Sequence, residues 1–333
     1  MPLSDSDIFK AQFYKFYTGK GEKDAFIKRW KELEELTEKI FHPINGTPMD
    51  ELFTRYMYFV RAKMGIKSST TEALRKFYEK DNYALLKKDS TFNDMITLAH
   101  FWEDVSNQDR DRFSPRILHR LFVLNYAPNG MWTYFVSVYF MKNKDANGML
   151  DDDAFYQFLN RITGFIWTYA VTNPGVNALR TPVYAEMVNI VNNRPVSFDG
   201  FKFEPATVKS MFANFTFSNT RPITKSMLAW WAFQDDLQEL ISLETVLEIE
   251  HIYARNRFDK DKSLSDVKNL EAIGNKALLE KRINIRAADY RFSDKIKYYQ
   301  GFTNSRNQKK EGTKNHELIN LATAADFTED DIR

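Results

Sequence analysis

Three stretches in the last third of the chain are the most informative about its fold: TVLEIEHI at Thr245–Ile252, LEAIGNKALL at Leu270–Leu279 and INIRAADYRFSDKIKYY at Ile283–Tyr299. The first stretch alternates branched and polar residues, which predicts a β-strand. The second contains a Gly-Asn pair inside an apolar run, which predicts another strand with a turn at its start. The third has helical periodicity, interrupted around Arg291–Ser293. Strand, loop, strand and helix together make a minimal ββα unit.

The chain before these stretches is predicted to be helical. Apolar residues recur at helical spacing, as Phe26, Trp30 and Leu33 do, and no fixed-period repeat is present. The predicted helices are Asp24–Ile40, Asp50–Lys63, Thr71–Leu86, Phe92–Val105, Pro115–Asn125, Trp132–Met141, Asp152–Val171, Pro174–Val191 and Ile223–Phe233. From Asn192 the sequence becomes richer in Pro, Asn and Phe, which indicates a junction. The predicted fold class is therefore mainly α, a multi-helical scaffold with a C-terminal embedded ββα unit.

These patterns divide the chain into an α-helical domain at residues 1–218, a ββα domain at 219–305 and a tail at 306–333. The composition supports a globular protein, because 43% of the 333 residues are hydrophobic and 28% are charged. The absence of cysteine excludes disulfides, Cys-ligated zinc and thiol nucleophiles. The most apolar run, Met131–Met141, is roughly half the length that a bilayer requires. With no secretory signal at the N-terminus, we expect a cytoplasmic protein and no membrane contact.

Four residues in the ββα stretches suit hydrolysis of a phosphodiester: Glu250, His251, Asn275 and Asn284. A neutral His near pH 7 can take a proton from the attacking water, which predicts His251 as the general base. Carboxylate and amide oxygens suit a hard divalent ion, so Glu250 and Asn284 are the predicted ligands of one Mg²⁺ or Mn²⁺. Asn275, on the opposite strand, is predicted to orient the imidazole of His251.

The alternation of side chains along a strand bears on this assignment. Strict alternation would put Glu250 and His251 on opposite faces and would put Glu248 on the face of Glu250. The two neighbours can share one site only if the strand bends or ends there. A single His on a strand is also more often a structural residue than a catalytic one, so the assignment depends on the combination with both Asn residues.

The stretches with IEHI, GNKALL and the final helix resemble the HNH (ββα-metal) domain at the C-terminus of GmrSD-type, modification-dependent restriction endonucleases. Asn275 and Asn284 have the separation usual in such domains, and Phe292 and Lys295 give the Phe-x-x-Lys that follows. The resemblance implies an embedded HNH unit that cleaves DNA in defence against bacteriophage. Where the family has a Pro after His-Ile, this sequence has Tyr253.

Relatives of this type carry a preceding ParB-like nucleotide-binding domain, and its motif is missing from this sequence. The resemblance therefore implies a partner domain or subunit outside the chain, and we expect no nucleotide binding by the chain itself. The last residues, ADFTEDDIR, look like a helix that stops abruptly. We therefore expect the chain to be truncated at both ends.

The basic charge is concentrated around the same stretches. Residues 250–314 carry 16 Lys and Arg against 9 Asp and Glu, whereas the whole chain has a net charge of only +2. Phosphate neutralisation is their expected role if the domain cleaves DNA, although a solvated basic face is the simpler alternative for any single residue. The predicted DNA contacts are Arg286, Lys295, Lys276 and Arg282, with Arg286 and Lys295 preferred because they follow Asn284.

We therefore predict a metal-dependent HNH endonuclease that hydrolyses DNA, in restriction of foreign or modified phage DNA. The alternative is a non-catalytic helical module that binds DNA or a partner through a degenerate nuclease. Two other stretches resemble ligand-binding motifs but lack essential residues. Asn143–Asp153 imitates a calcium loop but has Ala154 where a bidentate Glu is needed, and Gly19–Gly21 lacks the rest of a phosphate-binding loop.

Overall fold

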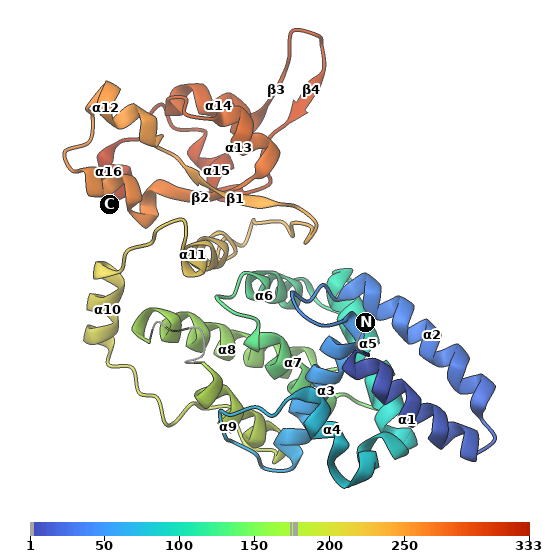
Figure 1. The fold of residues 1–333 in the computed structure, drawn as a ribbon. Helices are drawn as coiled ribbons and strands as arrows, with labels where there is room; N and C mark the ends of the chain where they lie inside the picture. Colours follow the sequence, from blue (N-terminus) through green and yellow to red (C-terminus); the bar gives the residue numbers. More distant parts are fainter. Residues whose placement is uncertain (1–2, 174, 176–178) are drawn as a thin grey trace. The chain divides into compact units, whose positions relative to one another are not determined.

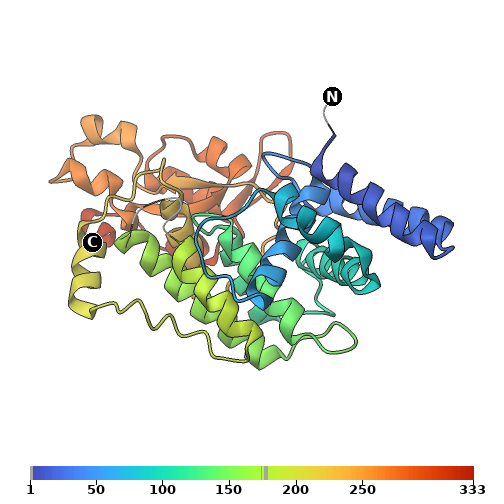
Figure 2. The ribbon, with the colours of Figure 1, turned by 60° about the horizontal axis from the view of Figure 1, so that its bottom comes forward.

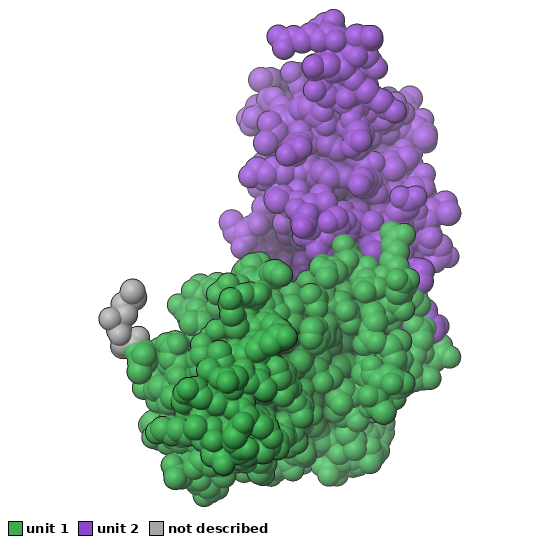
Figure 3. All heavy atoms as spheres, turned by 90° about the vertical axis from the view of Figure 1, so that its right-hand side faces the viewer, with its two compact units in different colours: residues 1–114, 130–162, 175–202 green, residues 115–129, 163–174, 203–333 purple. Residues whose placement is uncertain are grey.

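The computed structural model describes residues 3–173, 175 and 179–333, which form two compact units (Figure 3). The scaffold unit contains residues 1–114, 130–162 and 175–202, and the C-terminal unit contains residues 115–129, 163–174 and 203–333. The C-terminal unit thus takes two segments from the predicted helical domain. The predicted boundaries at residues 218 and 305 remain predictions, because compactness does not test which segments fold independently.

The scaffold unit is helical throughout the elements that the structure describes. Its elements are α1 (Asp5–Gly19), α2 (Lys23–Ile40), α3 (Pro48–Lys63), α4 (Leu74–Tyr83), η1 (Ala84–Lys87), α5 (Asp89–Ser106), α7 (Met131–Asn143), the first half of α8 (Asp152–Thr172) and α9 (Arg180–Val191). Figures 1 and 2 both show α1 and α2 side by side. The helix start predicted at Pro174 lies outside the described residues. Buried aromatic rings fill this unit; Trp30 and Phe92, for example, stack with their centroids 6.0 Å apart.

The C-terminal unit combines helices with two small sheets. Its elements are α6 (Pro115–Asn125), the second half of α8, α10 (Pro205–Asn214), α11 (Pro222–Ala232), β1 (Leu247–His251), η2 (Arg255–Arg257), α12 (Phe258–Asp261), η3 (Val267–Glu271), η4 (Ile273–Asn275), β2 (Lys276–Glu280), α13 (Lys281–Ala287), α14 (Phe292–Gln300), β3 (Gly301–Thr303), β4 (Lys309–Glu311), α15 (His316–Leu321) and α16 (Glu329–Ile332). Helix thus dominates the described chain, which confirms the predicted fold class.

The predicted ββα unit is present as β1, β2 and the helices that follow. β1 and β2 are antiparallel, with Leu247 opposite Glu280 and His251 opposite Lys276. The predicted interruption of the third stretch is a break between α13 and α14, where Ala288 has a φ of 42°. α11 packs against β2. The β1–β2 strand pair therefore packs against α11, which precedes it in the chain, and against α13 and α14, which follow it.

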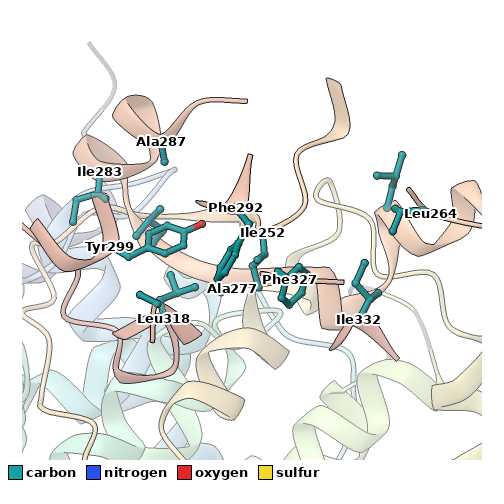
Figure 4. Packing of buried hydrophobic residues seen from close by; sticks show 13 residues of the cluster. Ile252, Leu264, Ala277, Ile283, Ala287, Phe292, Tyr299, Leu318, Phe327 and Ile332 are labelled. Atoms are coloured by element: carbon teal, nitrogen blue, oxygen red, sulfur yellow. The ribbon is translucent and has the colours of Figure 1, made fainter. Parts of the chain in front are cut away.

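One hydrophobic core joins the β1–β2 strand pair to α13, α14 and the last residues of the C-terminal unit. Ile252, Ala277, Phe292 and Tyr299 are buried in it together with apolar residues of the last helices (Figure 4). These last residues are Leu318, Ala322, Phe327 and Ile332. The segment predicted as a tail therefore supplies part of the core on which the ββα unit packs.

Candidate active site

The end of β1 is joined to the start of β2 through the backbone. His251 lies opposite Lys276, and the N–H of Ile252 donates to the carbonyl of Asn275 at 3.0 Å. The hydrogen-bonded ladder thus extends one residue beyond His251. β1 does not end before the Glu250–His251 pair, so the alternation of side chains continues through it.

This alternation places Glu250 and His251 in different surroundings. The Glu250 carboxylate accepts hydrogen bonds from Lys295 Nζ at 2.7 Å and from the Tyr299 hydroxyl at 2.6 Å, both on α14. The His251 ring instead lies near Glu271 of η3, with 3.8 Å between Nε2 and the carboxylate. The two neighbours therefore contribute to separate clusters of side chains.

The Glu250 cluster is part of the interior. The side chains of Glu250 and Lys295 are both almost fully buried, and Lys295 Nζ also donates to the His251 carbonyl at 2.6 Å. Burial raises the pKa of Glu250, and the charge and hydrogen bond of Lys295 oppose this effect. An ammonium group thus lies where a metal ion bound by Glu250 would have to lie.

Asn284, the second predicted ligand, lies on α13 and faces β1. Its side-chain amide donates to Glu248 Oε2 at 3.0 Å, and Lys281 Nζ lies 3.6 Å from the other oxygen of Glu248. This contact connects α13 to the strand. It does not bring Asn284 to His251, whose ring lies at Glu271.

The predicted ligands therefore do not fit a divalent ion as they are placed. Lys295 holds Glu250, Asn284 donates to Glu248, and His251 belongs to a different cluster. Among the residues that the structure describes, no three His, Asp or Glu side chains are grouped to hold an ion. We therefore assign no chemical step to a metal at these residues.

Asn275 joins the segment that follows β1 to the segment that precedes β2. Its side chain is fully buried, accepts from the N–H of Tyr253 at 2.7 Å, and donates to the carbonyls of Tyr253 at 3.0 Å and Leu270 at 3.1 Å. The predicted role was to orient the His251 ring directly. The contacts instead fix the backbone two residues after His251, so any effect of Asn275 on the ring acts through the main chain.

His251 has the properties of a proton acceptor. Its side chain is only 13% exposed, and within the described part of the chain Nε2 has no hydrogen-bond partner. Burial, followed by the charges of Arg255 and Lys276, lowers the pKa of His251 to about 4. The ring is therefore neutral at pH 7.

Glu271 connects the cations around His251. Its carboxylate accepts from Lys276 Nζ at 2.9 Å and forms an ion pair with Arg255. Glu271 was not among the predicted site residues. It lies four residues before Asn275, in a 3₁₀ turn whose spacing matches neither the strand nor the helix period. Only the folded turn brings it beside His251.

The four predicted DNA contacts divide into two pairs. The side chains of Lys276 and Lys295 are completely or almost completely buried, and both have partners inside the protein, so neither can contact a phosphate in this arrangement. Arg282 is exposed, and Arg286 is partly exposed with its guanidinium donating to the Glu311 carbonyl at 3.2 Å. Lys276 and Lys295 are thus corrected to interior ion-pair residues, because desolvated cations need internal partners.

An antiparallel two-stranded sheet with a His at the end of its first strand, an Asn directly before its second and a helix after it is the arrangement of ββα domains. Residues 206–333 match the family described as GmrSD restriction endonucleases, C-terminal domain. This match confirms the resemblance found in the sequence and indicates a nuclease of the restriction endonuclease type. A comparison with curated proteins gives no match.

The structure also bears on the predicted absence of a membrane span. Within the described residues, none of the helices combines the length and hydropathy that crossing a bilayer requires.

Proposed function

We propose that this protein hydrolyses DNA phosphodiester bonds in the restriction of foreign or modified phage DNA, as an HNH-type endonuclease with His251 as the general base. The observation that carries this proposal is the environment of His251. His251 lies at the end of β1 with a neutral imidazole, and its buried Nε2 has no hydrogen-bond partner among the described residues, so this nitrogen is available to accept the proton of a water molecule that reaches it. The match of residues 206–333 to a restriction endonuclease domain supports the choice of DNA as substrate.

Each residue near His251 has a separate task in this proposal. His251 takes the proton from water as the water oxygen bonds to phosphorus, while the bond from phosphorus to the leaving deoxyribose oxygen breaks and that oxygen takes a proton from solvent water. Arg255, which is more than half exposed, is suited to neutralise the phosphate that is attacked. Glu271 holds Arg255 and Lys276 in place, and Asn275 fixes the backbone that leaves His251.

A divalent ion, Mg²⁺ or Mn²⁺, belongs to the proposal as a requirement to be tested. When bound, such an ion supplies stabilisation for the charge that develops on the phosphate and on the leaving oxygen. Because the predicted ligands Glu250 and Asn284 are not placed for it, the proposal assigns no residue to this ion. A cytoplasmic location and an additional nucleotide-binding domain or subunit likewise remain proposals.

The alternative is a helical module that binds DNA or a partner with a degenerate nuclease site. One observation favours it: the carboxylate before His251 is bound by Lys295. This alternative predicts DNA binding without cleavage under any metal condition. The proposed nuclease predicts cleavage that depends on His251.

A plasmid-cleavage assay separates the two functions. The wild-type chain should cut plain or modified DNA with Mg²⁺ or Mn²⁺, and cutting should stop in excess chelator. His251→Ala should reduce the rate by at least about a hundredfold, because a general base contributes about 10²–10⁴. His100→Ala, at an exposed His of the scaffold unit, is the matched control and should cut at the wild-type rate.

Three outcomes would count against this assignment. If the wild type and His251→Ala cut equally well, His251 is not the base. If cutting continues in chelator, the metal requirement is wrong. If the wild type binds DNA but cuts no form of it under any metal condition, the degenerate-module alternative is correct.

A further inference from the structure

The hairpin β3–β4, at residues 301–311, takes no part in the site around His251. Its strands are antiparallel, with Phe302 opposite Lys310, and it extends beyond α13 and α14 (Figure 1). The turn is ordered by its own hydrogen bonds. The side-chain oxygen of Asn304 accepts from the N–H groups of Arg306 at 3.0 Å and Gln308 at 2.9 Å. The hairpin therefore has a defined conformation at its tip.

The base of the hairpin is fixed to the body of the unit. The N–H of Thr313 donates to the Tyr299 carbonyl at 2.8 Å, and a Cβ added at Gly312 would lie 2.3 Å from that carbonyl oxygen. Phe302 packs edge-on against Tyr298, with ring centroids 5.3 Å apart. A hairpin with two short strands is marginal by itself, so these contacts hold it as a rigid arm.

The arm carries basic residues without acidic partners. Arg306 and Lys309 are exposed and Lys310 is partly exposed. Within the described chain none of these three forms an ion pair, and Lys310 has only a 3.4 Å contact with Gln308. Glu311, at the base, is the one acidic residue in 301–311. Uncompensated positive charges on a projecting arm suit a polyanion.

The chemistry of the tip distinguishes between polyanions. Residues 303–309 read TNSRNQK, so the tip offers cations, amides and hydroxyls but no apolar side chain. A protein interface needs buried aromatic or aliphatic residues at its centre, which this tip does not provide. Contacts to a DNA backbone, in contrast, come mainly from Arg, Lys, Ser, Asn and Gln side chains. The tip therefore fits nucleic-acid phosphates better than an acidic protein.

We propose that the β3–β4 hairpin is a DNA-binding arm, in which Arg306, Lys309 and Lys310 contact the phosphate backbone of duplex DNA. This inference rests on the proposed nuclease function and adds a binding surface to it. The arm positions the duplex and does not read its sequence, because phosphates are the same at every base pair. Arg286 of α13 donates to the Glu311 carbonyl at the base of the arm, so α13 adds one more cation there.

The test measures the affinity of the full chain for a fluorescent duplex of about 30 base pairs, in chelator, as a function of salt. The variant Arg306→Ala/Lys309→Ala/Lys310→Ala is compared with a matched control, Lys28→Ala/Lys31→Ala/Lys39→Ala, which removes three exposed charges from α2. Each phosphate contact contributes about 0.9 to the logarithmic salt slope. Between 50 and 200 mM salt, the wild type should therefore lose about 40-fold more affinity than the arm variant.

The outcomes separate this inference from the function on which it rests. Equal salt slopes for the wild type and the arm variant would overturn the arm, while leaving the nuclease intact. A reduced slope in the α2 control as well would also overturn it, because the effect would then follow total charge. If the wild type binds no DNA, both proposals fail. Retained DNA binding by the arm variant, with lost binding to an acidic polypeptide such as polyglutamate, would assign the arm to a protein partner.

Thermal unfolding of the arm variant shows whether any loss of DNA affinity comes from loss of the folded structure. The three side chains lie outside the hydrophobic core, so the melting temperature should match that of the wild type. As a second variant, Arg306→Glu should weaken DNA binding more than Arg306→Ala, because it adds repulsion to the lost contact. If Arg306→Glu binds as tightly as the wild type, the arm does not contact phosphate.

Discussion

His251 and Glu250 are adjacent in the sequence, but their side chains lie in two separate clusters, each of which contains cations. Glu250 lies beside a buried ammonium group, and His251 lies among cations that disfavour its protonation. The strand backbone causes this separation, because successive side chains point to opposite faces. The neutral state of His251 therefore comes from burial and from Arg255 and Lys276, which belong to segments outside β1.

The neutral state of His251 predicts how stability depends on pH. Its pKa is about 4 in the folded protein and about 6.5 in an unfolded chain, so the unfolded state binds more protons between these values. Stability should therefore fall as the pH drops from 7 to 5, by on the order of 1 kcal/mol from this residue. Urea unfolding at both pH values should show a smaller pH effect for His251→Gln. An unchanged pH effect in that variant would contradict the lowered pKa.

At the scale of elements, Lys295 connects α14 to β1. Its ammonium group reaches both the Glu250 carboxylate and the carbonyl of His251. The backbone of His251, the last residue of β1, is therefore held by a helix that begins more than forty positions later in the sequence. The resemblance places a Lys at this position, and the structure gives it a buried ion pair in place of a DNA contact.

Removing the Lys295 charge should destabilise the protein. Lys295→Met leaves the Glu250 carboxylate buried without its cation, which costs about 3–5 kcal/mol. The double variant Glu250→Leu/Lys295→Met removes both charges and should recover most of that loss. Urea unfolding of the two variants tests the pair. If Lys295→Met unfolds like the wild type but has a flatter salt dependence of DNA binding, Lys295 is a phosphate contact after all.

At the scale of the whole molecule, the last residues complete the core of the C-terminal unit. Leu318 and Ile332 are buried in the cluster that contains Ile252. A Cβ added at Gly274 would lie 2.1 Å from the carbonyl oxygen of Ile332, so the chain end packs directly against the residue before Asn275. The stability of the site therefore depends on residues that follow it by more than fifty positions.

Two neighbouring residues of α15 test this dependence. Leu318 is fully buried, whereas Ile319 is 39% exposed. Leu318→Ala should destabilise the protein by about 2–5 kcal/mol, the range for loss of a buried leucine side chain. Ile319→Ala is the matched control and should cost less than about 1 kcal/mol. Equally small effects in thermal unfolding would mean that residues 306–333 are an appended tail.

Many of the elements follow from the sequence, because their periodicity is a local property. The helix predicted at Pro115–Asn125 has the same bounds in the structure, and the break predicted near Arg291 separates α13 from α14. The strand pair is also present where alternation and the Gly-Asn turn indicated it. The elements that were not predicted include α1, α10, α12, α15 and the β3–β4 hairpin. α1 and α10 have a smaller hydrophobic periodicity than α2 has, and the others are only three to six residues long. Alternation puts Glu250 and His251 on opposite faces, whereas the predicted shared site required the strand to bend or end at this pair. The strand pairing instead continues through both residues.

The partners of these side chains, in contrast, depend on long-range packing. The sequence did not show that Lys295 pairs with Glu250, that Asn275 bonds to the backbone at Tyr253, or that Glu271 lies beside His251. Each of these contacts joins segments from different elements, and each depends on which residues the packing removes from water. A lysine has the same local pattern whether it is exposed or buried. The environment of a lysine is set by the long-range packing of the core. That packing buries Lys276 and Lys295, two of the predicted DNA contacts, in interior ion pairs.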